Sequence, residues 1–435
     1  MNLAPTRHDR EILRLALPAL GSLAAEPLYV LADTAIVGHL GRSQLAALGI
    51  AATVLSVFAT FNFLQYGTTA QVARASGAGE TEAAARIGAQ ALWLSLAVGV
   101  VLAVGIAALA TPIVGLVGGE GRTAGYAVTY LRIVALGMPS AFIALGGQGF
   151  LRGVSDLRTP LLLVLGGNVV NVALELLFVY GFDWGIRGSA WGTAIAQTGM
   201  GAAITWAILR RVRRSNAAFR PALARRLLSV GKFIFVRTTA LISSFVLTGA
   251  VVAHLGDAPL AAHQIAFQLF IFLALVLDAI AIAGQIIVGR ELGAARADEA
   301  YAASARMIWL SVATGAVFAV GLLLLHDALP RGFSGDAQVL DQCARLWPLF
   351  ALMQPVAGAV FALDGILIGA SDGPYLAGSM AAAFVVCATL LLVGYEAGWG
   401  IRGVWSAIVA LMAVRLATLG ARFLRRRWLV TGWAG

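Results

Sequence analysis

The sequence predicts an all-α integral membrane protein of twelve transmembrane helices, arranged as two pseudo-symmetric lobes of six helices each. Three observations lead to this fold class. Of the 435 residues, 60% are hydrophobic and only 12% are charged, which is more apolar surface than a water-soluble core can bury. Apolar runs long enough to cross a bilayer recur along the chain. The second half of the chain also repeats motifs of the first half.

The transmembrane helices are expected where about 20 or more consecutive residues are apolar, because a helix of that length crosses the hydrocarbon core. The first run is too long for a signal-peptide core and no clear small-residue cleavage site follows it, so we expect it to be retained. The twelve runs are approximately 12–37, 46–72, 87–110, 126–150, 160–181, 189–209, 227–253, 262–288, 303–325, 343–368, 375–394 and 403–423.

Three motifs return after about 215 residues. GHLGRSQLAALGIA at 38–51 returns as AHLGDAPLAAHQIA at 253–266, and WGIRG at 184–188 returns unchanged at 399–403. FLRGVSD at 150–156 returns as ILIGASD at 366–372. Each copy holds six spans, an even number, so both copies insert in the same orientation. The repeat is therefore parallel, with a pseudo-two-fold axis along the membrane normal.

The repeat divides the chain into an N-lobe at 1–212, a basic linker at 213–226 and a C-lobe at 227–435. Two similar lobes that face each other leave a cleft, and rocking them about it is a route to alternating access. The organisation therefore favours a transporter of small molecules.

Basic residues indicate the orientation in the membrane. One alternate set of connections, together with both termini, holds 22 of the 31 lysines and arginines. By the positive-inside rule this side is cytoplasmic, so both termini are expected in the cytoplasm and the protein in the plasma (inner) membrane, surrounded by lipid. The net charge of +10 is gathered beside spans, which favours membrane anchoring over nucleic-acid binding.

Acidic residues in the oily stretch EPLYVLADTAIVGHLG single out a candidate site. Glu26 and Asp33 are seven residues apart, near one stripe of a helix, and Asp33 shares its depth with Glu175 of the fifth span. An ionisable group at a helix centre costs roughly 2.5–3.5 kcal/mol on insertion scales. Two close carboxylates in low dielectric cannot easily both ionise, so we predict a proton site. The candidate residues are Glu26, Asp33, Asn168, Asn171 and Glu175.

The alternative is that hydroxyls and amides of Tyr29, Thr34 and Asn171 hold these acids purely as packing. Pro18 and Pro27 remove backbone donors from the first span, so its bend could follow protonation, although a static kink explains them equally. Aromatic side chains could line a cleft for flat apolar cations, or face lipid or the core. These aromatic candidates are Tyr29, Phe61 and Tyr66.

The second half replaces these acids with a different set. Arg237, Asp278 and Asp364 can meet at similar depth in the seventh, eighth and tenth spans. Two aspartates and one arginine leave one spare negative charge, which invites a proton or a cationic substrate; the alternative is a structural ion pair.

Enzyme chemistry finds no support. Cys343 and Cys387 lie in or beside apolar runs without metal-ligand spacing, and no nucleophile–base constellation is present. We therefore expect no enzyme activity, cofactor or metal centre, with sodium at Asp33 and Glu175 as the one exception considered.

Four stretches carry a family resemblance: LADTAIVGHLG in the first span, FLRGVSDLRTP after the fourth, NVVNVALE in the fifth and LDGILIGASD in the tenth. They resemble the multidrug and toxic compound extrusion (MATE) family, in particular its DinF-like branch. The resemblance covers nearly the whole chain. It implies a V-shaped pair of six-helix lobes that exchanges organic compounds for protons or sodium ions.

The resemblance also implies roles for individual residues. Asp33 is similar to the family's coupling-ion aspartate, and Asn171 and Glu175 match the positions that complete that site, with Glu where many relatives have Asp. Some relatives carry an acid in the seventh span, where this chain has Arg237. Asp364 matches the LDGxxIGA pattern.

The predicted function is export of organic, cationic amphiphilic compounds in exchange for protons, by a monomer. A site of few acids and amides suits a proton, whereas sodium needs five or six oxygens. The alternatives are a sodium-coupled exporter, an organic-acid exporter of the same fold, and a lipid-precursor flippase.

Overall fold

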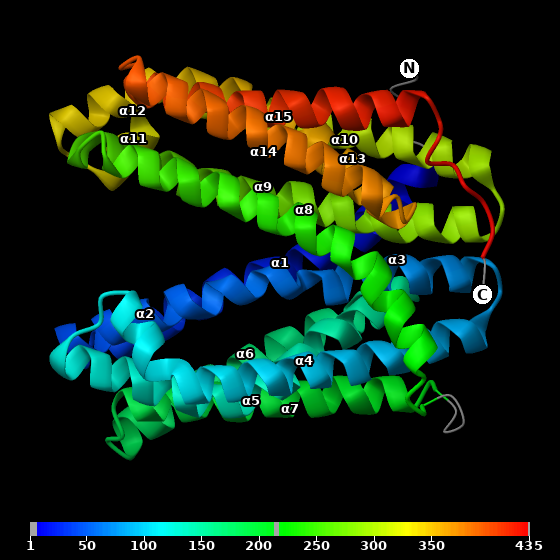
Figure 1. Cartoon of the computed structure of the whole chain (residues 1–435), viewed down its shortest axis with the longest axis horizontal. Coiled ribbons are helices and arrows are strands. Elements are labelled where there is room, and N and C mark those ends of the chain that lie inside the picture. Colours follow the sequence, from blue (N-terminus) through cyan, green and yellow to red (C-terminus); the bar gives the residue numbers. More distant parts are fainter. Residues whose placement is uncertain (1–6, 213–216, 434–435) are drawn as a thin grey trace. The chain divides into compact units, whose positions relative to one another are not determined.

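Every regular element in the described part of the chain is helical (Figure 1). The computed structural model describes residues 7–212 and 217–433. In the first half the elements are α1 (Arg7–Gly38), α2 (Arg42–Ser56), the 3₁₀ helix η1 (Val57–Asn62), α3 (Phe63–Gly77), α4 (Thr81–Leu116), α5 (Gly121–Gly153), α6 (Arg158–Leu176), the π-helical η2 (Leu177–Gly181) and α7 (Ile186–Leu209).

The second half follows the same plan. Its helices are α8 (Pro221–Ala253), α9 (Asp257–Gly293), α10 (Ala297–Leu324), the short α11 (Ala328–Phe333), α12 (Ala337–Leu352), α13 (Gln354–Gly369), α14 (Gly373–Glu396) and α15 (Gly400–Leu424). Each predicted apolar run falls within one of these helices or within adjoining ones, except that 303–325 ends one residue beyond α10.

Ten continuous helical segments of the described residues are long and apolar enough to cross a membrane, and the α12–α13 pair makes an eleventh if it forms one bent span. The remaining predicted span, 189–209, corresponds to α7, which is helical over 24 residues but rich in glycine, threonine and other small or polar residues. The all-helical, multi-span fold class predicted from the sequence is confirmed.

Two spans are interrupted. The 3₁₀ turn η1 separates α2 from α3, and α12 meets α13 at Met353 with a bend of 47°. Pro348 lies inside α12 and Pro355 in the first turn of α13. A proline lacks the amide hydrogen and its ring displaces the preceding carbonyl, so two prolines around Met353 account for the bend.

The repeated motifs adopt repeated backbone geometry. Gly41 precedes α2 with φ of 112°, and Gly256 precedes α9 with φ of 109°. Ser155 and Ser371, in the two copies of the SD motif, have φ of 62° and 60°. Glycine accommodates the left-handed region freely, whereas a serine held there marks a turn defined by its surroundings. The repeat is thus a repeat of turns as well as of helices.

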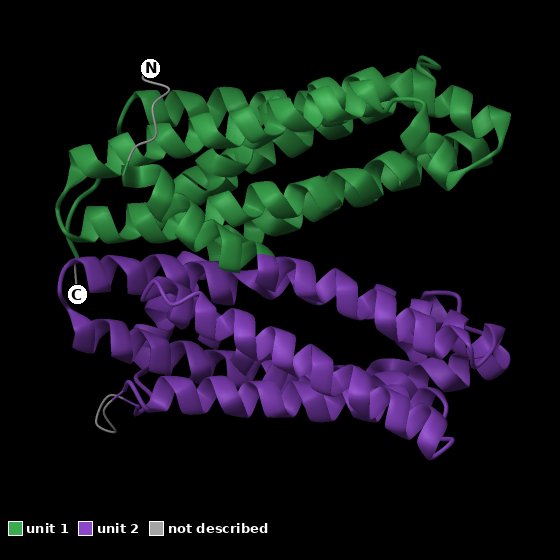
Figure 2. Ribbon diagram, turned by 180° about the vertical axis from the view of Figure 1, so that it is seen from behind, with its two compact units in different colours: residues 1–20, 232–434 green, residues 21–231, 435 purple. Residues whose placement is uncertain are grey.

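The chain divides into two compact units (Figure 2). One contains the residues up to Leu20 together with those from Lys232 to Ala434, and the other contains nearly all of Gly21–Gly231. The unit boundaries therefore fall inside α1 and α8. The lobe boundaries drawn from the sequence, whose linker includes residues 213–216 outside the described part, stay a prediction.

Candidate functional site

Asp33 is buried in the second half of α1, with its side chain held by α7. It is 6% exposed, and the Ser189 hydroxyl donates a hydrogen bond to its Oδ1 at 2.7 Å. Ser189 is the fourth residue of α7, just after the repeated WGIRG turn. The local sequence therefore positions a hydroxyl donor at the same level as the carboxylate.

Glu175 lies in the last turn of α6 and is fully buried. Its Oε1 accepts weak hydrogen bonds from the hydroxyls of Tyr29 and Thr193, each at 3.4 Å, and these two hydroxyls are 3.0 Å apart. Tyr29 is one turn before Asp33 on α1, and Thr193 is one turn after Ser189 on α7. Because residues four apart lie on the same face of an α-helix, the Ser189–Asp33 hydrogen bond and the Tyr29–Thr193–Glu175 group lie one helical turn apart.

The carboxyl groups of Asp33 and Glu175 lie close enough to influence each other electrostatically. Glu175 Oε2 is buried and has no hydrogen-bond partner. Among the described residues, no ion pair includes either acid. Two neighbouring carboxyl groups with hydroxyl partners, and no basic partner among the described residues, form an arrangement that suits one shared proton.

Asn171 and Asn168 join the same helix interface from α6. Asn171 is one turn before Glu175, is 4% exposed, and its Oδ1 has no hydrogen-bond partner. Asn168 Nδ2 donates to the backbone oxygen of Ala25 at 2.9 Å, which ties α6 to α1. The predicted grouping of first-span and fifth-span residues therefore has a direct structural counterpart for Asp33, Asn171 and Glu175.

Glu26 lies apart from this group. It is exposed on α1, whereas Asp33 is buried, and none of the described hydrogen bonds includes it. The prediction that Glu26 and Asp33 lie on one stripe of the helix specifies only the direction in which their side chains point. Neighbouring helices cover this stripe at the level of Asp33 but leave it exposed at Glu26. Pro18 and Pro27 lie within α1, which remains one continuous helix.

The aromatic candidates divide between two places. Tyr29 belongs to the carboxyl group just described, while Phe61 lies in η1, where its ring is 5.7 Å from that of Phe142 on α5 in an edge-on contact. Tyr66 is half-buried on α3. The structure therefore joins one of the three to the acids.

Sequence reasoning missed three residues of this site: Ser189 and Thr193 on α7, and Tyr130 on α5. Tyr130 is 3% exposed and lies within electrostatic range of Ser189, Thr193 and the two acids. Polar residues four apart at the start of an apolar run were the available signal for Ser189 and Thr193. Nothing in the local sequence distinguishes Tyr130 from an interfacial tyrosine.

A second buried charge cluster lies in the other unit. Asp364 on α13 forms ion pairs with Arg237 of α8 and with Arg415 of α15, and the Arg415 side chain is 3% exposed. The predicted pairing of Arg237 with Asp364 is present. Arg415 was not among the residues predicted for this cluster, and the structure makes it a second partner of Asp364. Asp278 is half-buried on α9.

The two clusters are not repeats of each other. Shifted by the repeat offset, Asp33 corresponds to Thr248 and Glu175 to Leu391, while Asp364 corresponds to Gln148. Each half therefore carries its own chemistry on a shared backbone plan.

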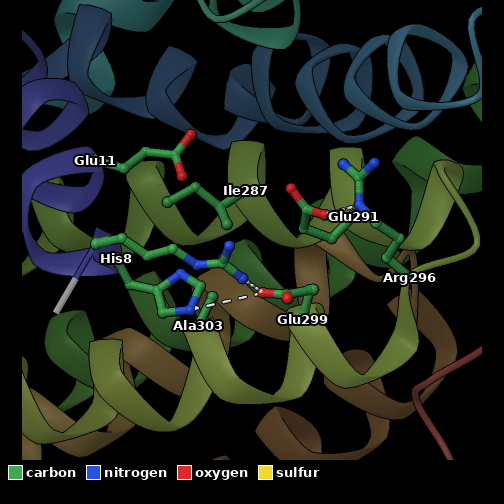
Figure 3. Close-up of a pocket in the computed structure, with 8 residues that line it drawn as sticks. His8, Glu11, Ile287, Glu291, Arg296, Glu299 and Ala303 are labelled. Carbon is green, nitrogen blue, oxygen red and sulfur yellow. Dashed lines mark hydrogen bonds and ion pairs between the residues drawn. The ribbon is translucent and has the colours of Figure 1, made fainter.

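A third charged group lies at the start of α1 (Figure 3). Arg7 pairs with Glu299 of α10, and His8 Nε2 is 3.8 Å from the same carboxylate. Glu11 accepts from Arg290 at 2.8 Å. Arg7, His8, Glu11 and Glu299 border a pocket of about 390 Å³ at the α9–α10 turn. Glu11 and Glu299 each already have a basic partner, so the group fastens helices together.

Long apolar helices in two repeated halves, with carboxylic acids buried inside one half, define a polytopic membrane transport protein. The chain belongs to the MatE family, the multidrug and toxic compound extrusion transporters, which it matches over residues 18–177 and 234–393. The family resemblance drawn from the sequence motifs is confirmed.

Two curated relatives illustrate the match. The chain is 30% identical to the DNA damage-inducible protein F of Escherichia coli (strain K12), with 98% of this chain and 94% of that protein covered. It is also 30% identical to the chloroplastic protein DETOXIFICATION 44 of Arabidopsis thaliana, over 93% of this chain and 80% of that protein.

Solved structures agree in fold. A multidrug resistance MATE family transporter of the MOP superfamily, determined in an outward-facing conformation, superposes with a TM-score of 0.88 at 20% identity, covering 97% of this chain and 96% of that one. At this identity the likeness concerns the fold alone.

Proposed function

We propose that the protein exports organic compounds, with cationic amphiphiles as the main class, in exchange for protons. The observation that carries the proposal is the placement of the buried carboxyls of Asp33 and Glu175 in one hydroxyl-lined site, with Glu175 Oε2 left without a hydrogen-bond partner. A proton placed between the two groups makes the missing hydrogen bond and removes the repulsion. Its release restores a negative charge that a cationic substrate can use.

The driving force is sufficient for this task. One proton moving inward across 100 mV contributes about 2.3 kcal/mol, which supports a substrate gradient of roughly fifty-fold before any pH difference is added. Alternating movement of the N-lobe and C-lobe would couple the two fluxes. The family, named for multidrug and toxic compound extrusion, supports organic compounds as the substrates.

Sodium is the second coupling ion to test. Asn171 Oδ1 and Glu175 Oε2 are both buried acceptors without hydrogen-bond partners, and a sodium ion would accept oxygen ligands from each. A proton fits better because hydroxyls that already hydrogen-bond to carboxylates surround the pair.

Organic-acid export is a second candidate function, supported by the C-terminal half. Arg237 and Arg415 both pair with Asp364, so one half-buried and one buried guanidinium group gather around one carboxylate. A carboxylate-bearing substrate or a lipid-linked precursor would favour such a region.

The test is dye efflux from proteoliposomes under an imposed pH gradient, with and without sodium. We compare wild type with Asp33→Asn and Glu175→Gln, which keep shape but remove a titratable group. Asp183→Asn, at an exposed loop position, is the matched control. We expect sodium-independent efflux in wild type and the control, and at least about a tenfold loss in both site variants.

If efflux requires a sodium gradient when the pH is the same on both sides of the membrane, the coupling ion is sodium and not the proton. If the protein exports citrate-like acids and not the dye, and Arg415→Gln abolishes this export while Asp33→Asn does not, the function is organic-acid export. If both site variants pump as wild type does while remaining folded, the carboxyl pair is not the coupling site.

A further inference from the structure

The segment that leads into α8 is attached to the side of α4. Trp93 Nε1 donates to the oxygen of Ala217 at 2.9 Å, and Gln90 Nε2 donates to the oxygen of Ala218 at 2.8 Å. Gln90 Oε1 also accepts from the amide of Arg220 at 2.8 Å. Gln90 is fully buried, so these three hydrogen bonds hold the backbone of 217–220 in one place.

Cations surround this attachment. Arg210, Arg220 and Arg225 are exposed, and no ion pair among the residues that the structure describes includes any of them. The guanidinium carbon of Arg210 lies 3.6 Å from the centre of the Trp206 ring. This contact leaves the edge of the guanidinium group available for further hydrogen bonds.

Large apolar side chains lie among the same cations. Trp206 is 58% exposed, Phe219 is 55% exposed and Leu228 is 42% exposed. The end of α7 and the α4 attachment site are neighbours, because a Cβ atom at Gly147 of α5 would lie 3.1 Å from Ile208 and 3.4 Å from Leu92. Charged and apolar side chains therefore alternate along the segment that runs from the end of α7 past the α4 attachment into the start of α8.

We infer that this surface, the linker patch of Trp206, Arg210, Phe219, Arg220, Arg225 and Leu228, binds the headgroups of anionic phospholipids. The arginines supply positive charge and bidentate donors for phosphate. The exposed rings and Leu228 require an adjoining apolar phase, which the acyl chains of a lipid provide and a soluble polyanion does not. The clamp by Gln90 and Trp93 presents the arginines in a defined arrangement, which makes the patch a site and not only a diffuse basic region.

The experiment titrates the purified full-length protein with phosphatidylglycerol or phosphatidylcholine and counts bound lipids by native mass spectrometry. The test variant carries Arg210→Gln, Arg220→Gln and Arg225→Gln. The matched control carries Arg122→Gln, Arg331→Gln and Arg402→Gln, three exposed arginines assigned to the opposite membrane face. Each cation near an anionic lipid surface is worth roughly fivefold in affinity, so we expect the test variant to lose at least about tenfold for phosphatidylglycerol.

Phosphatidylcholine binding should be the same in all three proteins, and an Arg210→Lys, Arg220→Lys, Arg225→Lys variant, which keeps the charge, should retain most of the phosphatidylglycerol affinity. Wild-type affinity in the glutamine test variant, or an equal loss in the control, would overturn the inference. A Phe219→Ser variant separates lipid from soluble polyanion. This variant should bind phosphatidylglycerol more weakly than wild type does. If its affinity for phosphatidylglycerol is unchanged, and wild type binds inorganic polyphosphate as tightly as phosphatidylglycerol, the partner is not a lipid.

Discussion

At the scale of residues, hydroxyl groups supply the described hydrogen bonds to Asp33 and Glu175, whereas guanidinium groups surround Asp364. A carboxylate paired with arginine keeps its charge, because removing the charge leaves the arginine buried and unpaired. A carboxyl held by hydroxyls can change between its charged and neutral forms, since a hydroxyl can either donate or accept. The contrast supports Asp33 and Glu175 as the proposed site of proton exchange.

Gly192 on α7 provides a test of how closely the carboxyl site is packed. A Cβ atom there would lie 3.0 Å from Glu175 Cγ and 3.3 Å from Asn171 Oδ1. We predict that Gly192→Ala displaces Glu175 and lowers proton-driven transport by about tenfold or more. The measurement is efflux in proteoliposomes under a fixed pH gradient.

Gly199, on the same helix, is the matched control because a Cβ atom added there would have no neighbour within 4 Å among the described residues. Gly199→Ala should leave transport unchanged and raise stability by about 0.5–1 kcal/mol through helix propensity. If Gly192→Ala and Gly199→Ala transport equally fast, α7 can shift away from Glu175 without an effect on transport.

At the scale of elements, α1 combines two roles. Its second half carries Tyr29 and Asp33, while its first turns are bound to α9 and α10 by ion pairs. Arg306 of α10 contacts both carboxylate oxygens of Asp9, at 2.6 and 2.8 Å, and its guanidinium lies 4.4 Å from the Trp309 ring centre. The helix that holds the proposed proton site is thus anchored at its other end.

A charge exchange tests this anchor. We predict that Asp9→Arg and Arg306→Asp each lower the melting temperature of the purified protein, because each places two like charges together. The double variant should recover most of the loss, since the pair is restored in reverse. The melting temperatures are measured by thermal unfolding in detergent. If the double variant melts no higher than the single variants, Asp9 and Arg306 act through other neighbours and not through each other.

The turn between α5 and α6 contains a second ionic contact. Asp156 accepts from the Thr159 amide at 3.0 Å and the Thr159 hydroxyl at 2.7 Å, and it pairs with Arg211 at 2.7 Å. Burial by itself would raise the pKa of Asp156, but the hydrogen bonds from Thr159 and the positive charge of Arg211 outweigh it and hold that pKa below its usual range. The equivalent Asp372 also pairs with an arginine, Arg422 of α15, although Arg422 is not at the position that corresponds to Arg211.

A lowered pKa in the folded state predicts the direction of a pH effect. The contribution of Asp156 to stability is fully present above its unfolded pKa, near 4. It is lost as the pH falls through the folded pKa. We therefore expect wild type to be more stable than Asp156→Asn by a constant margin at pH 5–7, narrowing below about pH 4. Thermal unfolding of both proteins across this pH range measures the difference in stability. A difference that grows as the pH falls would contradict a lowered pKa of Asp156 in the folded state.

At the scale of the whole molecule, the repeat preserves backbone geometry while side-chain chemistry diverges. The turns at Gly41 and Gly256 have nearly the same φ, yet Asp33 corresponds to Thr248. Packing and turns are needed equally in both halves for the spans to assemble. An ionisable group buried in a span has a cost, so each half keeps one only where a function or a partner compensates for it.

The parallel repeat also predicts topology. In a variant that lacks both native cysteines, a membrane-impermeant thiol reagent added to intact cells should label Asp183→Cys and Gly335→Cys. Ala78→Cys and Asp298→Cys, at turns on the opposite face, should be labelled only after permeabilisation. The reverse pattern would invert the orientation and move the linker patch to the outer leaflet.

The sequence by itself determined the class of fold and the family. Hydropathy marks spans because only helices satisfy their backbone hydrogen bonds within lipid, and the repeated glycine turns mark where the copies begin. It also identified Asp33, Asn171 and Glu175, since a polar residue in an apolar run is conspicuous by its cost.

Only the tertiary structure decided which polar groups meet. It brought Ser189, Thr193 and Tyr130 to the acids, left Glu26 exposed on the same helix as Asp33, and added Arg415 to Asp364. Periodicity specifies the direction of a side chain around its own helix, but the neighbour at that depth depends on how distant helices pack. For that reason the spans could be predicted from the sequence, and the partners of the buried charges could not.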